Sequence, residues 1–160
     1  MKIEIVPAYS YKEEISELFN EYTRMLVEGD PSFQQYLDIQ HYDAELARLE
    51  DKYGLPEGRL YIALAEGEAV GCVGLRKLDD ERCELKRLYV RPAFRGQGLS
   101  RRLMDRILAD ARAIGYRAML LDTLPFLEAA LALYKKYGFY EIPCYNDSPV
   151  ESTIFLRLDL

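Results

Sequence analysis

The stretch Arg95–Ser100 reads Arg-Gly-Gln-Gly-Leu-Ser, and it decides how the rest of the chain is interpreted. It lies between an apolar run that ends at Val90 and a periodic helical segment that begins near Gly98. A glycine turn that opens a helix presents unpaired backbone N–H groups at the positive end of the helix dipole. Because such a place binds phosphate, the stretch predicts a site for a phosphate-bearing compound.

Two common phosphate-binding loops do not fit this turn. A P-loop requires Gly-Lys-Ser/Thr, whereas Gly98 is followed by Leu99 and Ser100. A dinucleotide-binding fingerprint requires Gly or Ala three residues after the second glycine, and that position is Arg101 here. The turn alone is weak evidence, so its meaning depends on the sequence around it.

The composition limits the class of protein. With 160 residues, 49% of them hydrophobic and 30% charged, the chain suits a single soluble domain over residues 1–160. No apolar run approaches the roughly 18 residues of a membrane span, and the N-terminus lacks the apolar stretch of a secretory signal. The 3 cysteines are widely spaced, which favours a cytoplasmic protein without disulfides. The single histidine and the lack of a Cys/His cluster predict no metal site.

The net charge of −6 is unevenly distributed along the chain. Residues 1–58 contain 13 acidic and 5 basic residues, a balance of −8. Residues 86–106, which include the glycine turn, contain 7 basic residues and 1 acidic residue, a balance of +6. The acidic total argues against a nucleic-acid partner, while the local basic cluster favours a compact polyanion.

Hydrophobic periodicity predicts the order β-α-α-β-β-β-α-β-α-β-β. This order is typical of an α/β (α+β) fold in which helices flank a central mixed sheet. Asp30 is expected to cap the second helix, with Pro31 at its first position. The expected strands cover residues 2–7, 60–64, 69–75, 82–90, 119–121, 139–142 and 153–158. The expected helices cover residues 11–28, 31–52 in one or two pieces, 98–115, and the segment from Pro125 to Gly138.

The sequence around the turn, residues 84–103, resembles the acetyl-CoA-binding core of the GCN5-related N-acetyltransferase (GNAT) superfamily. The family's pyrophosphate loop, Gln/Arg-x-x-Gly-x-Gly/Ala, is matched by Arg95 and Gly98, with Ser100 in place of the usual Gly or Ala. A second family element, Tyr-x-x-x-Gly-Phe, is matched by residues 134–139. The two elements lie at the family's usual separation, and the resemblance implies a small, bacterial-type GNAT fold over nearly the whole chain.

This resemblance implies an acetyl-CoA-dependent N-acetyltransferase, in which a primary amine attacks the thioester directly in a ternary complex and no metal takes part. The pantetheine arm is implied to pair, as an added strand, with backbone groups of Leu88, Tyr89 and Val90. The residues implied to hold the diphosphate are Arg95, Gly96, Gln97, Gly98, Leu99, Ser100 and Arg101.

Amine acetylation needs a base for the ammonium, N–H donors for the oxyanion and a group beside the leaving thiolate. The resemblance places Tyr134 on the thiolate side, although this residue also suits the buried stripe of its helix. Glu84 is the first candidate for the base, directly or through water, and an ion pair with Lys86 or Arg87 is its alternative role. Asp122 is the second candidate, and it would otherwise cap the next helix.

The resemblance also places the first two helices over the acceptor site. The balance of −8 there favours a small cationic amine, although solvated helix faces explain the charge equally well. Phe33, Tyr36, Tyr42 and Tyr145 are candidates for an aromatic wall, and the loop 143–149 is expected near the acceptor cleft. Two other functions remain open: acetylation of a protein lysine or N-terminus, and non-catalytic acyl-CoA sensing. A homodimer is compatible with these observations.

Overall fold

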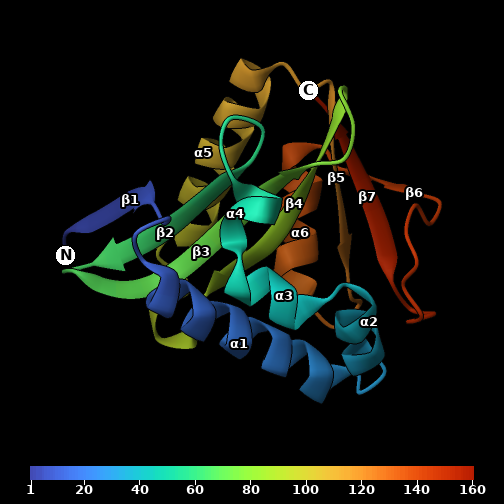
Figure 1. The fold of residues 1–160 in the computed structure, drawn as a ribbon, viewed down its shortest axis with the longest axis horizontal. Helices are drawn as coiled ribbons and strands as arrows, with labels where there is room; N and C mark the ends of the chain where they lie inside the picture. Colours follow the sequence, from blue (N-terminus) through green and yellow to red (C-terminus); the bar gives the residue numbers. More distant parts are fainter.

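The computed structural model describes residues 1–160, and its strands form one seven-stranded sheet in the order β1-β2-β3-β4-β5-β7-β6 (Figure 1). All neighbouring strands are antiparallel except β4 and β5. The strands are β1 (Ile3–Pro7), β2 (Arg59–Ala65), β3 (Glu68–Lys77), β4 (Arg82–Val90), β5 (Ala118–Thr123), β6 (Tyr140–Ile142) and β7 (Ile154–Asp159). The helices are α1 (Lys12–Gly29), α2 (Phe33–Ile39), α3 (Tyr42–Ala47), α4 (Leu49–Tyr53), α5 (Leu99–Ile114) and α6 (Glu128–Tyr137), with a 3₁₀ turn at Pro92–Phe94. This is the predicted mixed sheet flanked by helices.

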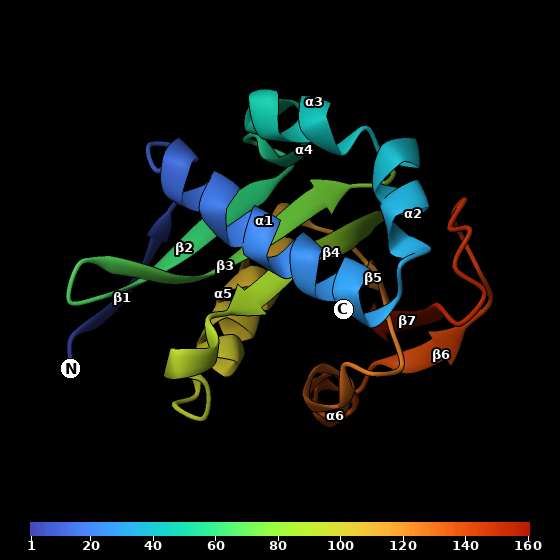
Figure 2. The same cartoon turned by 90° about the horizontal axis from the view of Figure 1, so that it is seen from below.

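The helices cover both faces of the sheet. Figure 2 shows α1, α3 and α4 on one face and α5 and α6 on the other. Helix α5 packs against the sheet because Leu99, Leu103 and Ile107 recur every four residues and form one apolar stripe. On the opposite face, Ile15 and Leu18 of α1 belong to a second buried cluster. None of the helices combines the length and the apolar character of a membrane span.

The segment between α1 and β2 differs in detail from the prediction. It contains three short helices rather than one or two, because His41 adopts a left-handed φ of 57° and Arg48 has a non-helical backbone with φ of −140° and ψ of 73°. Asp30 does not cap the second helix. Its Oδ1 instead accepts hydrogen bonds from the backbone N and the Oγ of Ser32, at 3.1 and 2.6 Å, and α2 begins at Phe33.

Strand β4 separates from β5 partway along its length. The parallel pairing of the two strands ends at Glu84 and Leu120. Shortly beyond, the register with β3 shifts at a β-bulge, where Arg87 adopts a left-handed φ of 60°. The backbone edge of β4 from Leu85 to Val90 therefore has no strand partner on the β5 side, and the sheet is open there.

A buried ion pair holds the bulge in place. The Arg87 Nε donates to Glu45 Oε2 at 3.1 Å, and Lys52 Nζ lies 2.6 Å from Glu45 Oε1. The Arg87 and Glu45 side chains are only 3% and 1% exposed. Burial acts to raise the pKa of Glu45, but the charges of Arg87 and Lys52 outweigh it and lower that pKa to about 2.

We expect Glu45→Gln to lower the free energy of unfolding by about 3–5 kcal/mol, because it leaves the Arg87 guanidinium buried without a counter-charge. Urea unfolding at pH 7 measures this, with Asp43→Asn, exposed on the same helix, as the control. In the wild-type protein the Glu45 contribution is fully present above the ordinary pKa of 4.5 and is lost as the pH falls towards about 2. Equal stabilities of the two variants would contradict this role.

Candidate active site

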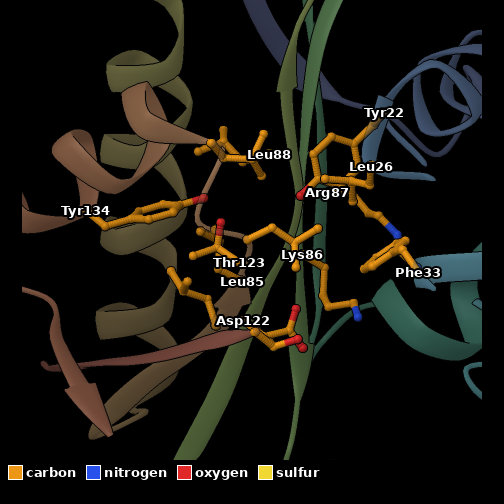
Figure 3. Close-up of a pocket in the computed structure, with 14 residues that line it drawn as sticks. Tyr22, Leu26, Phe33, Leu85, Lys86, Arg87, Leu88, Asp122, Thr123 and Tyr134 are labelled. Carbon is orange, nitrogen blue, oxygen red and sulfur yellow. The ribbon is translucent and has the colours of Figure 1, made fainter. Parts of the chain in front are cut away.

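Two adjoining cavities lie where β4 and β5 separate. The larger one, the turn cavity, contains about 1640 Å³ of space including its open mouth, and extends from the glycine turn to α6. The smaller one, the inner cavity, encloses only about 20 Å³, or about 490 Å³ when its open mouth is included, and lies between α1, α2, β4 and β5 (Figure 3). Tyr22, Leu88, Leu127 and Tyr134 line both cavities, so these four residues mark their junction.

The turn cavity brings together most of the predicted diphosphate-binding residues. Gly98 is the N-cap of α5, so the unpaired N–H groups of the first helical turn are available there. Gly96 and Gly98 have φ of 80° and 78°, a conformation that favours glycine. Gln97 lies in the turn but does not line the cavity. The predicted residues that line it are Arg95, Gly96, Gly98, Leu99, Ser100 and Arg101.

The free edge of β4 borders the same cavity. Leu88, Tyr89 and Val90 all line it, and their strand has no partner on the β5 side. An extended molecule with amide groups can pair with such an edge as an added strand. Opposite this edge lie residues of α6 and the segment before it, including Leu127 and Leu133. The cavity therefore suits a long ligand with an anionic end at α5 and an amide-bearing arm along β4.

Tyr134 stands at the inner end of the turn cavity. Its ring packs edge-on against Phe139, with ring centroids 5.6 Å apart, so it has the packing role expected of its helix stripe. Its hydroxyl forms no hydrogen bond within the protein and reaches the junction of the cavities, as Figure 3 shows. Burial raises the pKa of Tyr134 well above its ordinary value, which keeps the hydroxyl protonated and able to donate.

Asp122 is the one carboxylate residue that lines the inner cavity. Its Oδ2 accepts hydrogen bonds from the Tyr36 hydroxyl at 2.5 Å and from Asn146 Nδ2 at 2.7 Å. These bonds fix the carboxylate at the end of β5 and tie it to the loop before β7. The second candidate base from the sequence therefore lies beside the small cavity that adjoins the turn cavity.

Glu84, the first candidate base, lines neither cavity. Its buried carboxylate accepts hydrogen bonds from Arg76 Nε at 2.7 Å and from the Tyr145 hydroxyl at 2.5 Å. Lys86 Nζ lies farther away, at 3.9 Å. Burial acts to raise the pKa of Glu84, but the charges of Lys86 and Arg76 outweigh it and lower that pKa. Its role as the base stays a prediction.

Lys86 is a site residue, although the sequence indicated only a role as an ion-pair partner of Glu84. It is 8% exposed and lines the inner cavity. Burial lowers the pKa of its ammonium to about 8, and the neighbouring Arg87 charge acts in the same direction. The available signal was the alternation of Glu84 and Lys86 along a strand, which places both on one face.

The proposed aromatic wall is only partly assembled. Phe33 lines the inner cavity, whereas Tyr42 stacks near the Arg87 guanidinium, with 5.4 Å between the charge and the ring centre. Tyr36 and Tyr145 bind the carboxylates of Asp122 and Glu84 instead. No acidic residue of the segment 1–58 lines the inner cavity.

The fold and this site define a class of protein. Residues 13–139 match the family model described as Acetyltransferase (GNAT) family. The chain therefore belongs to the GNAT acetyltransferase family, and it is an acyltransferase enzyme.

One relative agrees with this membership, and two solved structures share the fold. An uncharacterized N-acetyltransferase of Schizosaccharomyces pombe is 39% identical over 130 residues, which is 80% of each chain. An acetyltransferase of Streptococcus agalactiae has a similar structure, with a TM-score of 0.79 and 23% identity over 99% of this chain and 98% of that one. The PaiA N-acetyltransferase of Thermoplasma acidophilum, solved in complex with coenzyme A, has a TM-score of 0.75 and 17% identity over the full length of both chains.

Proposed function

We propose that the protein transfers the acetyl group of acetyl-CoA to a primary amine of a small molecule, with both substrates bound together. One observation carries this proposal. The cavity of the glycine turn and the unpaired β4 edge leads directly to Tyr134 and to a second cavity that contains Asp122. A donor and an acceptor can therefore meet at the point where the two cavities adjoin.

Acetyl-CoA suits the turn cavity in both charge and shape. Its diphosphate matches the α5 N-terminus, where Arg95 and Arg101 add positive charge. Its amide-bearing arm matches the free edge of β4. The PaiA relative, whose structure contains coenzyme A, supports the same donor. When bound, the donor supplies an activated acetyl group, and backbone N–H groups of Leu88 to Val90 are the proposed donors to its carbonyl oxygen.

The lining of the site favours direct attack by the amine. No cysteine lines either cavity, so the protein offers no thiol nucleophile for a covalent acetyl-enzyme. Initial-velocity kinetics with varied acetyl-CoA and amine test this point. A ternary complex gives intersecting double-reciprocal lines, whereas a covalent intermediate that forms before the amine binds gives parallel lines.

Two carboxylates are candidates for removal of the ammonium proton. We propose Asp122 for direct contact with the acceptor amine, because it lines the inner cavity and Glu84 does not. Glu84 would act only through a relay, and Tyr145, bonded to its carboxylate, is the side chain through which such a relay could begin. The free Tyr134 hydroxyl is proposed to stabilise or protonate the departing thiolate.

We expect Tyr134→Phe to lower kcat by about 10-fold and to change the Kd for acetyl-CoA by less than about 2-fold. The effect is modest for proton transfer because a thiol, with a pKa of about 8.5, leaves readily. Stopped-time acetylation assays and calorimetric binding separate the two quantities. Tyr140→Phe, which removes an exposed hydroxyl, is the matched control. An unchanged kcat in Tyr134→Phe would reduce this residue to a packing role.

The enclosure of the inner cavity favours a small acceptor over a protein chain. The loop before β7 is held against the cavity wall, since Asn146 Nδ2 contacts both Asp122 Oδ2 and the Tyr36 hydroxyl, at 2.7 and 2.8 Å. The acceptor's ammonium would meet Asp122 there. The strongly cationic acceptor expected from the charge of residues 1–58 stays a prediction, because that segment adds only Tyr22, Leu26 and Phe33 to the lining.

A further inference from the structure

Lys86 is a buried cation at the inner cavity without a close anionic partner. Its ion pair with Glu84 Oε1 is long, at 3.9 Å. Its one hydrogen bond, to Gln40 Oε1, is 3.4 Å long. An ammonium carries three donors, so most of the hydrogen-bonding capacity of Lys86 is unused within the protein. A buried charge in this condition is unfavourable unless a further partner reaches it.

The carboxylates around Lys86 are bound to other groups. Glu84 has its short contact with Arg76, at 2.7 Å. Glu45 is shared by Arg87 and Lys52, at 3.1 and 2.6 Å.

Asp122 accepts from Tyr36 and Asn146. The cluster therefore contains three carboxylates, those of Glu45, Glu84 and Asp122. Its four cations are Lys52, Arg76, Lys86 and Arg87. One positive charge is in excess, and Lys86 is the cation with the weakest contacts.

Gln40 gives a second, independent observation at the same place. Its Oε1 accepts from both Lys86 Nζ and Arg87 NH2, which fixes the orientation of the amide. Its Nε2 is then buried without any hydrogen-bond partner, the only side-chain nitrogen or oxygen of the protein in this state, although Gln40 itself does not line the inner cavity. Buried polar groups are normally paired, so an unpaired N–H beside an under-coordinated ammonium indicates a missing acceptor of hydrogen bonds.

We propose that the acceptor is an amino acid, whose carboxylate binds Lys86 Nζ. This inference rests on the proposed function and specifies its acceptor. Lys86 and Asp122 line the same cavity, and in Figure 3 their polar ends lie on the same side of it. A zwitterion bound at the junction by Tyr134 would direct its carboxylate into the inner cavity towards Lys86 and hold its amine near Asp122. A carboxylate has the several lone pairs that an ammonium requires.

The test compares acids with their own amides. Wild-type enzyme and acetyl-CoA are assayed by thiol release with the common L-amino acids, the corresponding amino-acid amides and the decarboxylated amines. We expect kcat/KM for the best amino acid to exceed that for its amide by at least about 10-fold, as expected for the loss of a hydrogen bond to a charged group. Lys86→Met is expected to remove this preference by lowering kcat/KM for the acid while changing it for the amide by less than about 3-fold. Lys86→Arg should restore part of the preference, and the exposed Lys136→Met is the control.

Each other result overturns the inference. Equal kcat/KM for acids and amides shows that the carboxylate is not recognised. An equal loss of kcat/KM for acids and for amides in Lys86→Met shows that Lys86 has only a structural role. Acetylation of the decarboxylated amines but not of the amino acids refutes the amino-acid acceptor and leaves the proposed acetyltransferase activity intact. Failure to acetylate any compound overturns the acceptor assignment, and calorimetric binding of acetyl-CoA then shows whether the donor site also fails.

Discussion

Gly98→Glu is expected to weaken acetyl-CoA binding by at least about 100-fold, which corresponds to about 2.7 kcal/mol. Gly98 is the N-cap of α5 and has φ of 78°. A glutamate there would place a negative charge at the N–H groups that are proposed to hold the diphosphate. Repulsion between this carboxylate and the phosphates adds to the loss of the helix-end interaction, because both anions would compete for the same donors.

The chain contains a matched control for this variant. Gly67, in the turn between β2 and β3, has φ of 83°, and a Cβ added at either glycine would meet no atom within 4 Å. Gly67→Glu therefore imposes the same left-handed strain, of about 1–2 kcal/mol, without changing the glycine turn that is proposed to hold the diphosphate. Calorimetry measures the two Kd values for acetyl-CoA. Equal affinities in Gly98→Glu and Gly67→Glu would refute the role of the turn.

Asp122→Asn is expected to lower kcat by about 100- to 1000-fold, within the range for loss of a general base. The change keeps the size of the side chain and a carbonyl oxygen for the Tyr36 and Asn146 hydrogen bonds. We therefore expect the Kd for acetyl-CoA and the melting temperature to change little. Asp147→Asn, exposed on the adjoining loop, is the control for a charge change in this region.

Glu84→Gln decides between the two candidate bases. With Asp122 as the base, Glu84→Gln should lower kcat by less than about 10-fold, well short of the loss expected for Asp122→Asn. The reverse pattern, with normal turnover in Asp122→Asn and a loss of about 100-fold or more in Glu84→Gln, would return the role to Glu84. That result would require a relay from the inner cavity to the buried carboxylate.

Patterns that depend on neighbouring residues predicted most of the fold. The four-residue spacing of Leu99, Leu103 and Ile107 identified α5, because a helix repeats its buried face at that interval. Two features were not predictable in this way. The break between α2 and α3 depends on a left-handed His41, and the β4 bulge depends on a left-handed Arg87. Neither residue type signals that conformation, so tertiary contacts must impose it.

The site, like the fold, has one part that local sequence predicts and one part that depends on long-range contacts. The glycine turn is a local motif, and the structure places nearly all of its predicted residues around one cavity. The surroundings of Lys86 depend on Gln40, which is 46 positions away in the sequence. The bond between Glu84 and Tyr145 spans 61 positions. Such pairings follow from the three-dimensional packing of α2, β4 and the loop before β7, and no short-range pattern encodes them.

The most direct test of the central claim is a thiol-release assay with acetyl-CoA and a panel of amines, which includes amino acids, polyamines and a lysine peptide. We expect thiol release that requires both enzyme and a small amine, with an equal amount of N-acetylated product detected by mass spectrometry. Release only with the lysine peptide would contradict the small-molecule acceptor. Binding of acetyl-CoA without release for any amine would contradict the catalytic claim and favour an acyl-CoA sensor.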